Sequence, residues 1–252
     1  MNALEIFLVI VVGTAAGFLN TVAGGGSLIT MPLLIFLGLP SAAANGTNRI
    51  ALMVQNVVAI ANFRSKGYFD WKLGLILAVP AAVGAVAGSK IALSLPDDIF
   101  NKVLAVVMLC VLAVTIWNPQ KKLKNRKEEP GTKEKIIGVA VFFGVGVYGG
   151  FIQAGVGFII IASLTLLTGY SLVKINSMKV FISAVYMVFS LIVFIVGGKV
   201  DWVLGLTLAA GNALGGYLGS SFSVSKGDKW IKIILAVTVV AMALELLGVI
   251  NI

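Results

Sequence analysis

The sequence predicts an all-α polytopic membrane protein made of two inverted repeats, each with about five hydrophobic helical segments and a broken or re-entrant helix at a Gly-rich motif. Three observations support this fold class. Hydrophobic residues make up 59% of the 252 residues, with a mean hydropathy of +1.05. Charged residues make up only 12%, about half the fraction found in soluble domains. Much of the first half of the sequence also recurs in the second half.

The recurrence has a constant interval of 131 residues from Gly24 onward. Residues 70–75 (DWKLGL) return as residues 201–206 (DWVLGL), and several glycines, Asn45 and Asp97 recur at the same interval. A duplicated hydrophobic unit is typical of secondary transporters, whose substrate site lies where the two halves meet. We therefore expect a first membrane repeat, a charged linker and a second membrane repeat, at residues 1–118, 119–135 and 136–252.

Ten apolar stretches account for the predicted helices. Those of the first half predict helices over residues 4–20, 27–38, 46–63, 73–93 and 99–117. Those of the second half predict helices over residues 136–152, 157–169, 178–197, 203–222 and 231–248. A helix needs about 20 apolar residues to cross the hydrocarbon core. The second helix of each half is shorter than this, so it is either a half-helix or one arm of a re-entrant hairpin.

The positively charged residues orient the chain, because cytoplasmic loops carry an excess of Lys and Arg. The linker at residues 119–135 is therefore expected to be cytoplasmic. An odd number of crossings per half places five further lysines on the same side, whereas an even number places them outside: Lys174, Lys179, Lys226, Lys229 and Lys232. Odd crossings imply inverted repeats with both termini outside. Five crossings per half, or three crossings plus a re-entrant hairpin, satisfy this condition equally.

The first candidate site is the glycine-rich segment 17–27 (GFLNTVAGGGS) between two apolar stretches. Three consecutive glycines disfavour a continuous helix, and a broken helix within a membrane is tolerated where it lines a cavity. A helix starting near Ser27 would present N–H groups and a positive dipole end to an anion. Segment 153–157 (QAGVG) matches this break in the second half, and paired breaks indicate a transporter site. The alternative is that the glycines only form a tight turn.

The second candidate site is segment 44–49 (ANGTNR), which is expected to open the third helix. Arg49 precedes a long apolar run, and an ionisable residue there is a functional hypothesis by default. Its guanidinium suits planar anions with several oxygens, although snorkelling to the lipid headgroups is an alternative. Asn176 and Lys179 occupy the matching place in the second half. Inversion would place the two helix ends on opposite membrane faces, so they need not contact one ligand together.

Several classes of function are disfavoured by what the sequence lacks. The chain has no His, the commonest metal ligand, and its one cysteine, Cys110, allows no internal disulfide. We expect no metal and no cofactor. No paired intramembrane acids or activated nucleophile are visible, so an enzyme is not predicted. The residues behind the net charge of +9 lie in a few loops, where they indicate the membrane topology. Nucleic acid is therefore not an expected partner. Polar residues deeper in the helices either line a path or bond across helices: Gln55, Asn56 and Asn62.

The motifs resemble those of the sulfite exporter TauE/SafE family, also called the TSUP family of anion transporters. The resemblance is carried by Pro32 and by residues 16–27, 38–40, 44–48, 176–180 and 200–202, and it covers nearly the whole chain outside the linker. It implies a multi-pass inner-membrane carrier for sulfur-containing or organic anions, such as sulfite or sulfonates. The second half departs from the pattern, because QAGVG lacks the triple glycine and Ser163 stands where the first half has Pro32.

These observations predict a secondary transporter that moves a small anion across the cytoplasmic membrane by alternating access. The residues expected to bind the anion are Asn20, Thr21, Gly24, Gly25, Gly26, Ser27, Thr47, Asn48, Arg49, Gln153, Asn176 and Lys179. The other expected partners are the lipid bilayer and, left open, a second copy of the chain in a homo-oligomer. An anion channel, or the membrane subunit of a larger transport system, is the alternative function.

Overall fold

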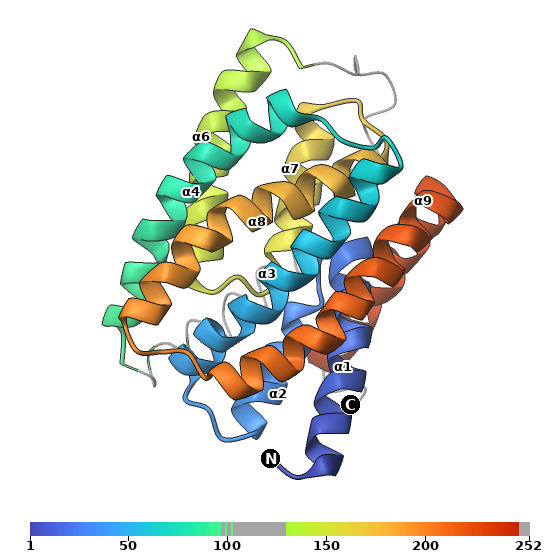
Figure 1. Ribbon diagram of the computed structural model, residues 1–252. Helices are drawn as coiled ribbons and strands as arrows, with labels where there is room; N and C mark the ends of the chain where they lie inside the picture. Colours follow the sequence, from blue (N-terminus) through green and yellow to red (C-terminus); the bar gives the residue numbers. More distant parts are fainter. Residues whose placement is uncertain (97–98, 100–101, 103–129, 247–252) are drawn as a thin grey trace.

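The computed structural model describes residues 1–96, 99, 102 and 130–246. This part of the chain contains helices and no strands, which confirms the all-α class (Figure 1). The helices are α1 (Ala3–Val22), α2 (Ser27–Phe36), α3 (Ser41–Ser65), α4 (Trp71–Ser94), α6 (Thr132–Phe151), α7 (Val156–Leu167), α8 (Leu172–Val196) and α9 (Trp202–Leu246). Most of the helix predicted at 99–117, Cys110 and most of the linker predicted at 119–135 lie outside the described residues.

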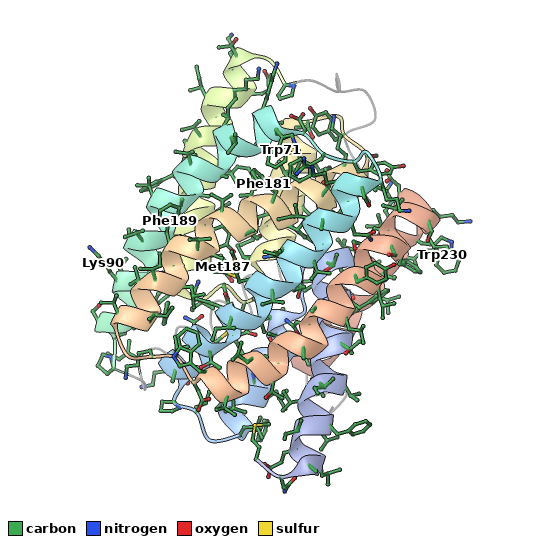
Figure 2. All side chains as sticks on the ribbon, viewed as in Figure 1. Trp71, Lys90, Phe181, Met187, Phe189 and Trp230 are labelled. Carbon is green, nitrogen blue, oxygen red and sulfur yellow. The ribbon has the colours of Figure 1, made fainter. Side chains whose placement is uncertain are left out.

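The helices have the lengths and surfaces of a multi-pass membrane protein. Four of them, α1, α4, α6 and α8, are long and apolar enough to cross a membrane. Helices α2 and α7 are apolar but have only 10 and 12 residues. Large apolar side chains such as Phe189 and Trp230, each 46% exposed, cover the outer surface (Figure 2). A continuous apolar exterior of this kind suits lipid rather than water.

Three helix starts predicted from hydropathy, at residues 46, 136 and 178, are wrong by about one turn or more, since α6 begins at Thr132. Helix α3 begins at Ser41, directly after Pro40, and α8 begins after Ser171, whose side chain accepts a hydrogen bond from the Lys174 N–H. Helix α8 therefore starts at a side-chain cap and not at the first apolar run. Because α3 begins at Ser41, Arg49 lies about two turns inside α3 and not at its opening.

The last two predicted helices, at 203–222 and 231–248, form the two arms of α9. Gly227 has non-helical backbone angles within α9, with φ 68° and ψ −169°. A positive φ is favourable for glycine because it has no Cβ. The chain therefore bends at Gly227 and continues as helix to Leu246.

The repeated DW motif starts a helix in both halves. Asp70 accepts a hydrogen bond of 3.2 Å from the Leu73 N–H at the start of α4. Asp201 accepts one of 2.9 Å from the Leu204 N–H at the start of α9. An N-cap carboxylate satisfies one of the N–H groups that have no partner within the helix. The recurrence of this motif thus has a direct structural cause.

The most extensive helix contacts join the two halves of the sequence. Helix α1 packs along α9 and α4 packs along α6, while α3 lies against both α8 and α9 (Figure 1). Glycines permit the closest approaches. A Cβ built on Gly84 would lie 2.2 Å from the Phe143 carbonyl oxygen, and one on Gly215 would lie 2.2 Å from the Thr14 carbonyl oxygen. Any larger residue at these glycines would force the paired helices apart.

Equivalent helices of the two halves run in opposite directions. In Figure 1, α1 begins at the lower edge of the molecule and α6 begins at the upper edge. Helix α3 rises toward the upper right, whereas α8 descends from the upper right to the lower left. Opposite directions are what inverted repeats require. The inverted repeats, their boundaries and their orientation in the membrane stay predictions.

Candidate functional site

Both predicted helix breaks are present, and they meet at the centre of the molecule. The first break lies between α1 and α2, with Gly24 at φ 97°, and the second lies between α6 and α7, with Gly155 at φ 71°. A Cβ built on Gly24 would lie 2.5 Å from the carbonyl carbon of Gly157. A Cβ on Gly157 would lie 2.4 Å from the Gly24 Cα. The two breaks therefore cross in backbone contact, which only glycine at both positions allows.

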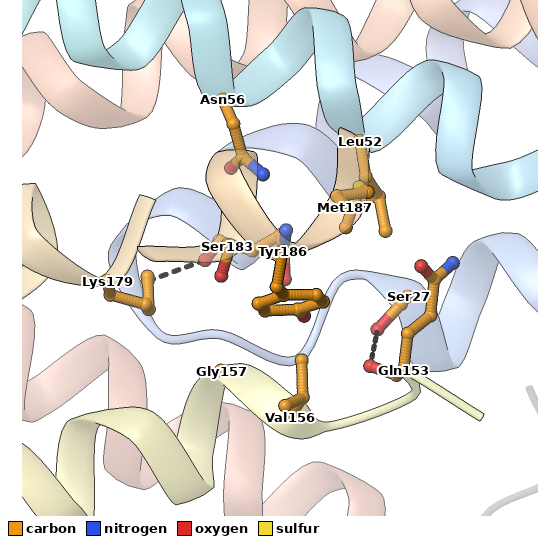
Figure 3. Close-up of a pocket in the computed structure, with 11 residues that line it drawn as sticks. Ser27, Leu52, Asn56, Gln153, Val156, Gly157, Lys179, Ser183, Tyr186 and Met187 are labelled. Carbon is orange, nitrogen blue, oxygen red and sulfur yellow. Dashed lines mark hydrogen bonds between the residues drawn. The ribbon is translucent and has the colours of Figure 1, made fainter. Parts of the chain in front are cut away.

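Ser27 ties the two breaks together. Its hydroxyl donates a hydrogen bond of 3.5 Å to the Gln153 carbonyl oxygen and accepts one of 3.3 Å from the Gly155 N–H (Figure 3). Gln153 has a φ of 52°, which is uncommon for a residue with a side chain. The backbone of the second break is thus held in a strained conformation by contacts from the first half.

Arg49 caps the end of α6 from the other half of the sequence. Its side chain is completely buried and donates hydrogen bonds to the carbonyl oxygens of Gly149 (3.1 Å) and Gly150 (2.7 Å). The Asn45 amide donates a bond of 2.7 Å to the next carbonyl, that of Phe151. The last carbonyls of a helix lack intrahelical partners and carry partial negative charge, so a cation is favourable there. Since Arg49 is buried inside the protein, it does not snorkel to headgroups.

Lys179 caps the end of α1 in the same way. Its ammonium donates hydrogen bonds of 2.7 Å to the carbonyl oxygens of both Asn20 and Thr21. The Asn176 amide donates a bond of 2.8 Å to the Val22 carbonyl oxygen. Each half therefore supplies an asparagine and a cation that complete the broken helix of the other half. The sequence pattern contained this signal, because Asn45 and Asn176 are 131 positions apart and a cation follows each.

A small cavity lies beside the crossing (Figure 3). Its lining residues come from α1, α2, α3, α7, α8 and the second break: Asn20, Ser27, Leu52, Asn56, Gln153, Val156, Gly157, Lys179, Ser183, Tyr186 and Met187. The cavity volume is about 20 Å³, which is room for about one water molecule. Both halves of the sequence contribute to it.

Four of the residues proposed from sequence line this cavity: Asn20, Ser27, Gln153 and Lys179. The sequence analysis missed most of the others on α3 and α8. A signal for them existed, since Ser183, Tyr186 and Met187 follow Lys179 at helical spacing and share its face of α8. Leu52 and Asn56 are likewise one turn apart on α3.

The other proposed residues lie around the crossing but do not line the cavity. Thr47 accepts a hydrogen bond of 2.9 Å from the Asp201 N–H, at the start of α9. The Thr21 hydroxyl accepts one of 3.3 Å from the Gln55 side chain. Asn48 is buried, and its amide has no hydrogen-bond partner among the described residues. The remaining five cap a helix or form the first break: Gly24, Gly25, Gly26, Arg49 and Asn176.

The cavity is electrostatically positive. Lys179 is the one charged side chain among the described residues that line it, and no lining residue is acidic. Ser27 is the first residue of α2 and Val156 the first of α7, so two helix starts, which carry partial positive charge, border the cavity. The carbonyl ends of α1 and α6 are capped by Lys179 and Arg49. This arrangement favours a bound anion.

No three His, Cys, Asp or Glu side chains gather in the described part of the chain. No solved structure matches the chain. Among curated proteins it is 27% identical to the probable membrane transporter protein ORF9 of a Sinorhizobium species, over 92% of this chain and 88% of the relative. It is 28% identical to the probable membrane transporter protein YfcA of Escherichia coli K12, over 94% and 87%.

A more distant relative is the probable membrane transporter protein YunE of Bacillus subtilis, 20% identical over 95% of this chain and 96% of the relative. These relatives and the apolar helices support a role in membrane transport. The family model described as sulfite exporter TauE/SafE matches residues 9–246. Because that match extends over nearly the whole chain, the protein belongs to the sulfite exporter TauE/SafE family.

Proposed function

We propose that the protein is a secondary transporter that moves a small anion, such as sulfite or a sulfonate, across the cell membrane by alternating access. One observation carries this proposal. The buried Lys179 side chain lines a small cavity without acidic lining residues, at the crossing of two broken helices. A buried charge is costly without a partner of opposite sign. The anion would supply that partner.

The choice of anion class has two supports. The name of the family refers to the export of sulfite, an oxyanion of sulfur. An ammonium, an amide and hydroxyl groups are hydrogen-bond donors of the kind that bind oxyanions, and Lys179, Gln153 and Ser27 provide them in this cavity. Sulfite and small sulfonates fit this chemistry because each presents several oxygens around one sulfur.

The small size of the cavity supports alternating access. At about 20 Å³ the cavity holds about one water molecule and no sulfonate. An anion can therefore enter only if the elements around the crossing move apart. Since the crossing joins both halves of the sequence, rocking of one half against the other would open the cavity to either side in turn. A channel would instead need a continuous open path.

The test is counterflow of labelled sulfite in proteoliposomes that contain the wild-type protein. We expect saturable uptake that accelerates when unlabelled sulfite is present inside the vesicles, because a carrier exchanges substrate across the membrane. The Lys179→Gln variant should lose most of this exchange. Lys232→Gln is the matched control, since Lys232 is an exposed lysine on α9. Uptake that does not saturate would contradict the carrier, and full activity of Lys179→Gln would remove Lys179 from the site.

A further inference from the structure

We propose that the cavity selects singly charged anions that themselves carry an N–H or O–H hydrogen-bond donor. This inference rests on the proposed function and names its substrate class more closely. It depends on Lys179 and Gln153 both lining the same small cavity. The two groups differ in what they offer a ligand: Lys179 offers only donors, whereas Gln153 offers donors and an acceptor.

The Gln153 amide is buried without a hydrogen-bond partner among the described residues. Its side chain is completely buried, and neither Nε2 nor Oε1 has a hydrogen-bond partner among the described residues. A buried amide without partners is destabilising, so native proteins rarely retain one that has no function. The backbone of Gln153 is fixed at its uncommon φ by bonds to Ser27 and Val156, which hold the residue at the cavity.

Both ends of the Gln153 amide need a partner, whichever way the amide is turned. Its NH₂ group can donate to an oxygen of the anion, but its carbonyl oxygen can only accept. No described side chain lies within hydrogen-bonding distance of the Gln153 side-chain carbonyl oxygen to supply that donor. Two of the three Lys179 N–H groups are bound to the Asn20 and Thr21 carbonyl oxygens, so the third is left for the charged oxygen of the ligand. A ligand with its own N–H or O–H would supply the donor that Gln153 lacks.

The charge of the cavity points to a monoanion. Lys179 is the one full positive charge among the described lining residues. A dianion would bring a second negative charge into the same buried space, where an uncompensated charge is costly. A monoanion with one N–H or O–H carries the groups that match Lys179, the Gln153 NH₂ group and the Gln153 carbonyl oxygen.

Three tetrahedral anions of similar shape differ in charge and in hydrogen-bond donors, so their binding tests the two requirements separately. Sulfamate is a monoanion with an NH₂ donor, methanesulfonate is a monoanion with a methyl group in its place, and sulfate is a dianion with no donor. Their affinities are measured by competition against labelled sulfite exchange in wild-type proteoliposomes, and independently by calorimetry on the detergent-solubilised protein. We expect sulfamate to bind about tenfold more tightly than methanesulfonate, because a site with a buried acceptor rejects an analogue that leaves it unpaired. Sulfate should bind most weakly.

The Gln153→Met variant tests the assignment to one side chain. Methionine has a similar length without the polar amide, so sulfamate and methanesulfonate should then bind within about twofold of each other. The matched control is Gln55→Met. Gln55 is also buried, but its amide bonds to Thr21 and Asn212 and it does not line the cavity. This control should keep the preference for sulfamate in whatever fraction of the protein is folded.

Each outcome bears on a different claim. Equal binding of sulfamate and methanesulfonate to the wild-type protein would overturn the inference but leave the carrier in place. A preference that persists in Gln153→Met would also overturn it. If sulfite itself is neither bound nor exchanged by folded wild-type protein, the proposed function fails and this inference fails with it.

Discussion

Arg49 and Lys179 have the same structural role in opposite halves of the molecule, yet only one of them lines the cavity. Both are buried cations of a third helix, and both bind the last carbonyl oxygens of the other half's first helix. Arg49 also donates to Asn45 and lies 4.5 Å above the Phe194 ring. Lys179 keeps one N–H and faces the cavity. A duplicated architecture can thus keep one cation for the fold and use its counterpart for a ligand.

The largest expected effect comes from comparing Lys179→Gln with Arg49→Gln. Lys179→Gln should weaken anion binding by about 100-fold or more, because the charge partner of the anion is lost. Arg49→Gln should leave the affinity within about threefold but lower the free energy of unfolding by about 3 kcal/mol, since several bonds from a charged donor are removed. Calorimetric binding and thermal unfolding in detergent measure both quantities. Equal losses of affinity in the two variants would contradict the distinction.

A second comparison concerns two glycines that both have positive φ. Gly24 has φ 97° and Gly38 has φ 92°, but a Cβ on Gly24 would meet the Gly157 backbone at 2.5 Å while one on Gly38 would meet nothing within 4 Å. Gly24→Ala should therefore abolish sulfite exchange and destabilise the protein strongly. Gly38→Ala should cost only the backbone strain of about 1–2 kcal/mol and keep exchange.

Thermal unfolding and exchange assays on both glycine variants measure this difference. If Gly24→Ala folds and exchanges sulfite as well as Gly38→Ala does, the two breaks are not in the close backbone contact described above. The comparison would then lose its structural basis.

The smallest expected effect separates the two repeated aspartate caps. Asp70 accepts a hydrogen bond of 2.7 Å from the Tyr170 hydroxyl and lies 3.9 Å from the Lys174 ammonium, both from the other half. Partial burial raises the pKa of the Asp70 carboxyl, but the bonds from Tyr170 and the Leu73 N–H and the charge of Lys174 outweigh it, so the pKa lies below its ordinary value of 3.8. Ionised Asp70 therefore stabilises the fold above that value, and this stabilisation is lost as pH falls through the lowered pKa.

At neutral pH we expect Asp201→Asn to lose a cap contribution of about 1 kcal/mol or less, and Asp70→Asn to lose more because its contacts with Tyr170 and Lys174 are also removed. Asp70→Asn should also flatten the fall in unfolding temperature on acidification below about pH 4. Unfolding temperatures measured from pH 3 to pH 7 in detergent test this. An acid profile of Asp70→Asn identical to that of the wild type would show that the contacts with Tyr170 and Lys174 contribute nothing to stability.

Much of the fold could be predicted because its causes are local. Apolar length predicted helices such as α1 and α4, and the triple glycine predicted the first break, since both depend on residues adjacent in sequence. The starts of α3 and α8 were missed because the polar residues within them are satisfied by distant partners. Asn45, for example, binds the Phe151 carbonyl oxygen, 106 positions away.

The candidate site was predicted less completely for the same reason. Sequence alone indicated that Arg49 and Lys179 matter, but both were expected to bind the anion. Their bonds to helix ends of the other half could be recognised only once the crossing of the two breaks was known. The sequence showed which residues carry charge or hydrogen-bonding groups. Which groups they bind depends on how the two halves pack together.

The most direct test of the account is the position of a bound anion. Hydrogen selenite is a monoanion with an O–H donor, and its selenium can be located by anomalous scattering in crystals grown with it. The account predicts a selenium peak in the cavity. One oxygen of the anion should lie within hydrogen-bonding distance of Lys179 Nζ, and its O–H should point at the side-chain carbonyl oxygen of Gln153. A well-ordered crystal structure at saturating selenite that shows no selenium peak beside Lys179 would contradict the account.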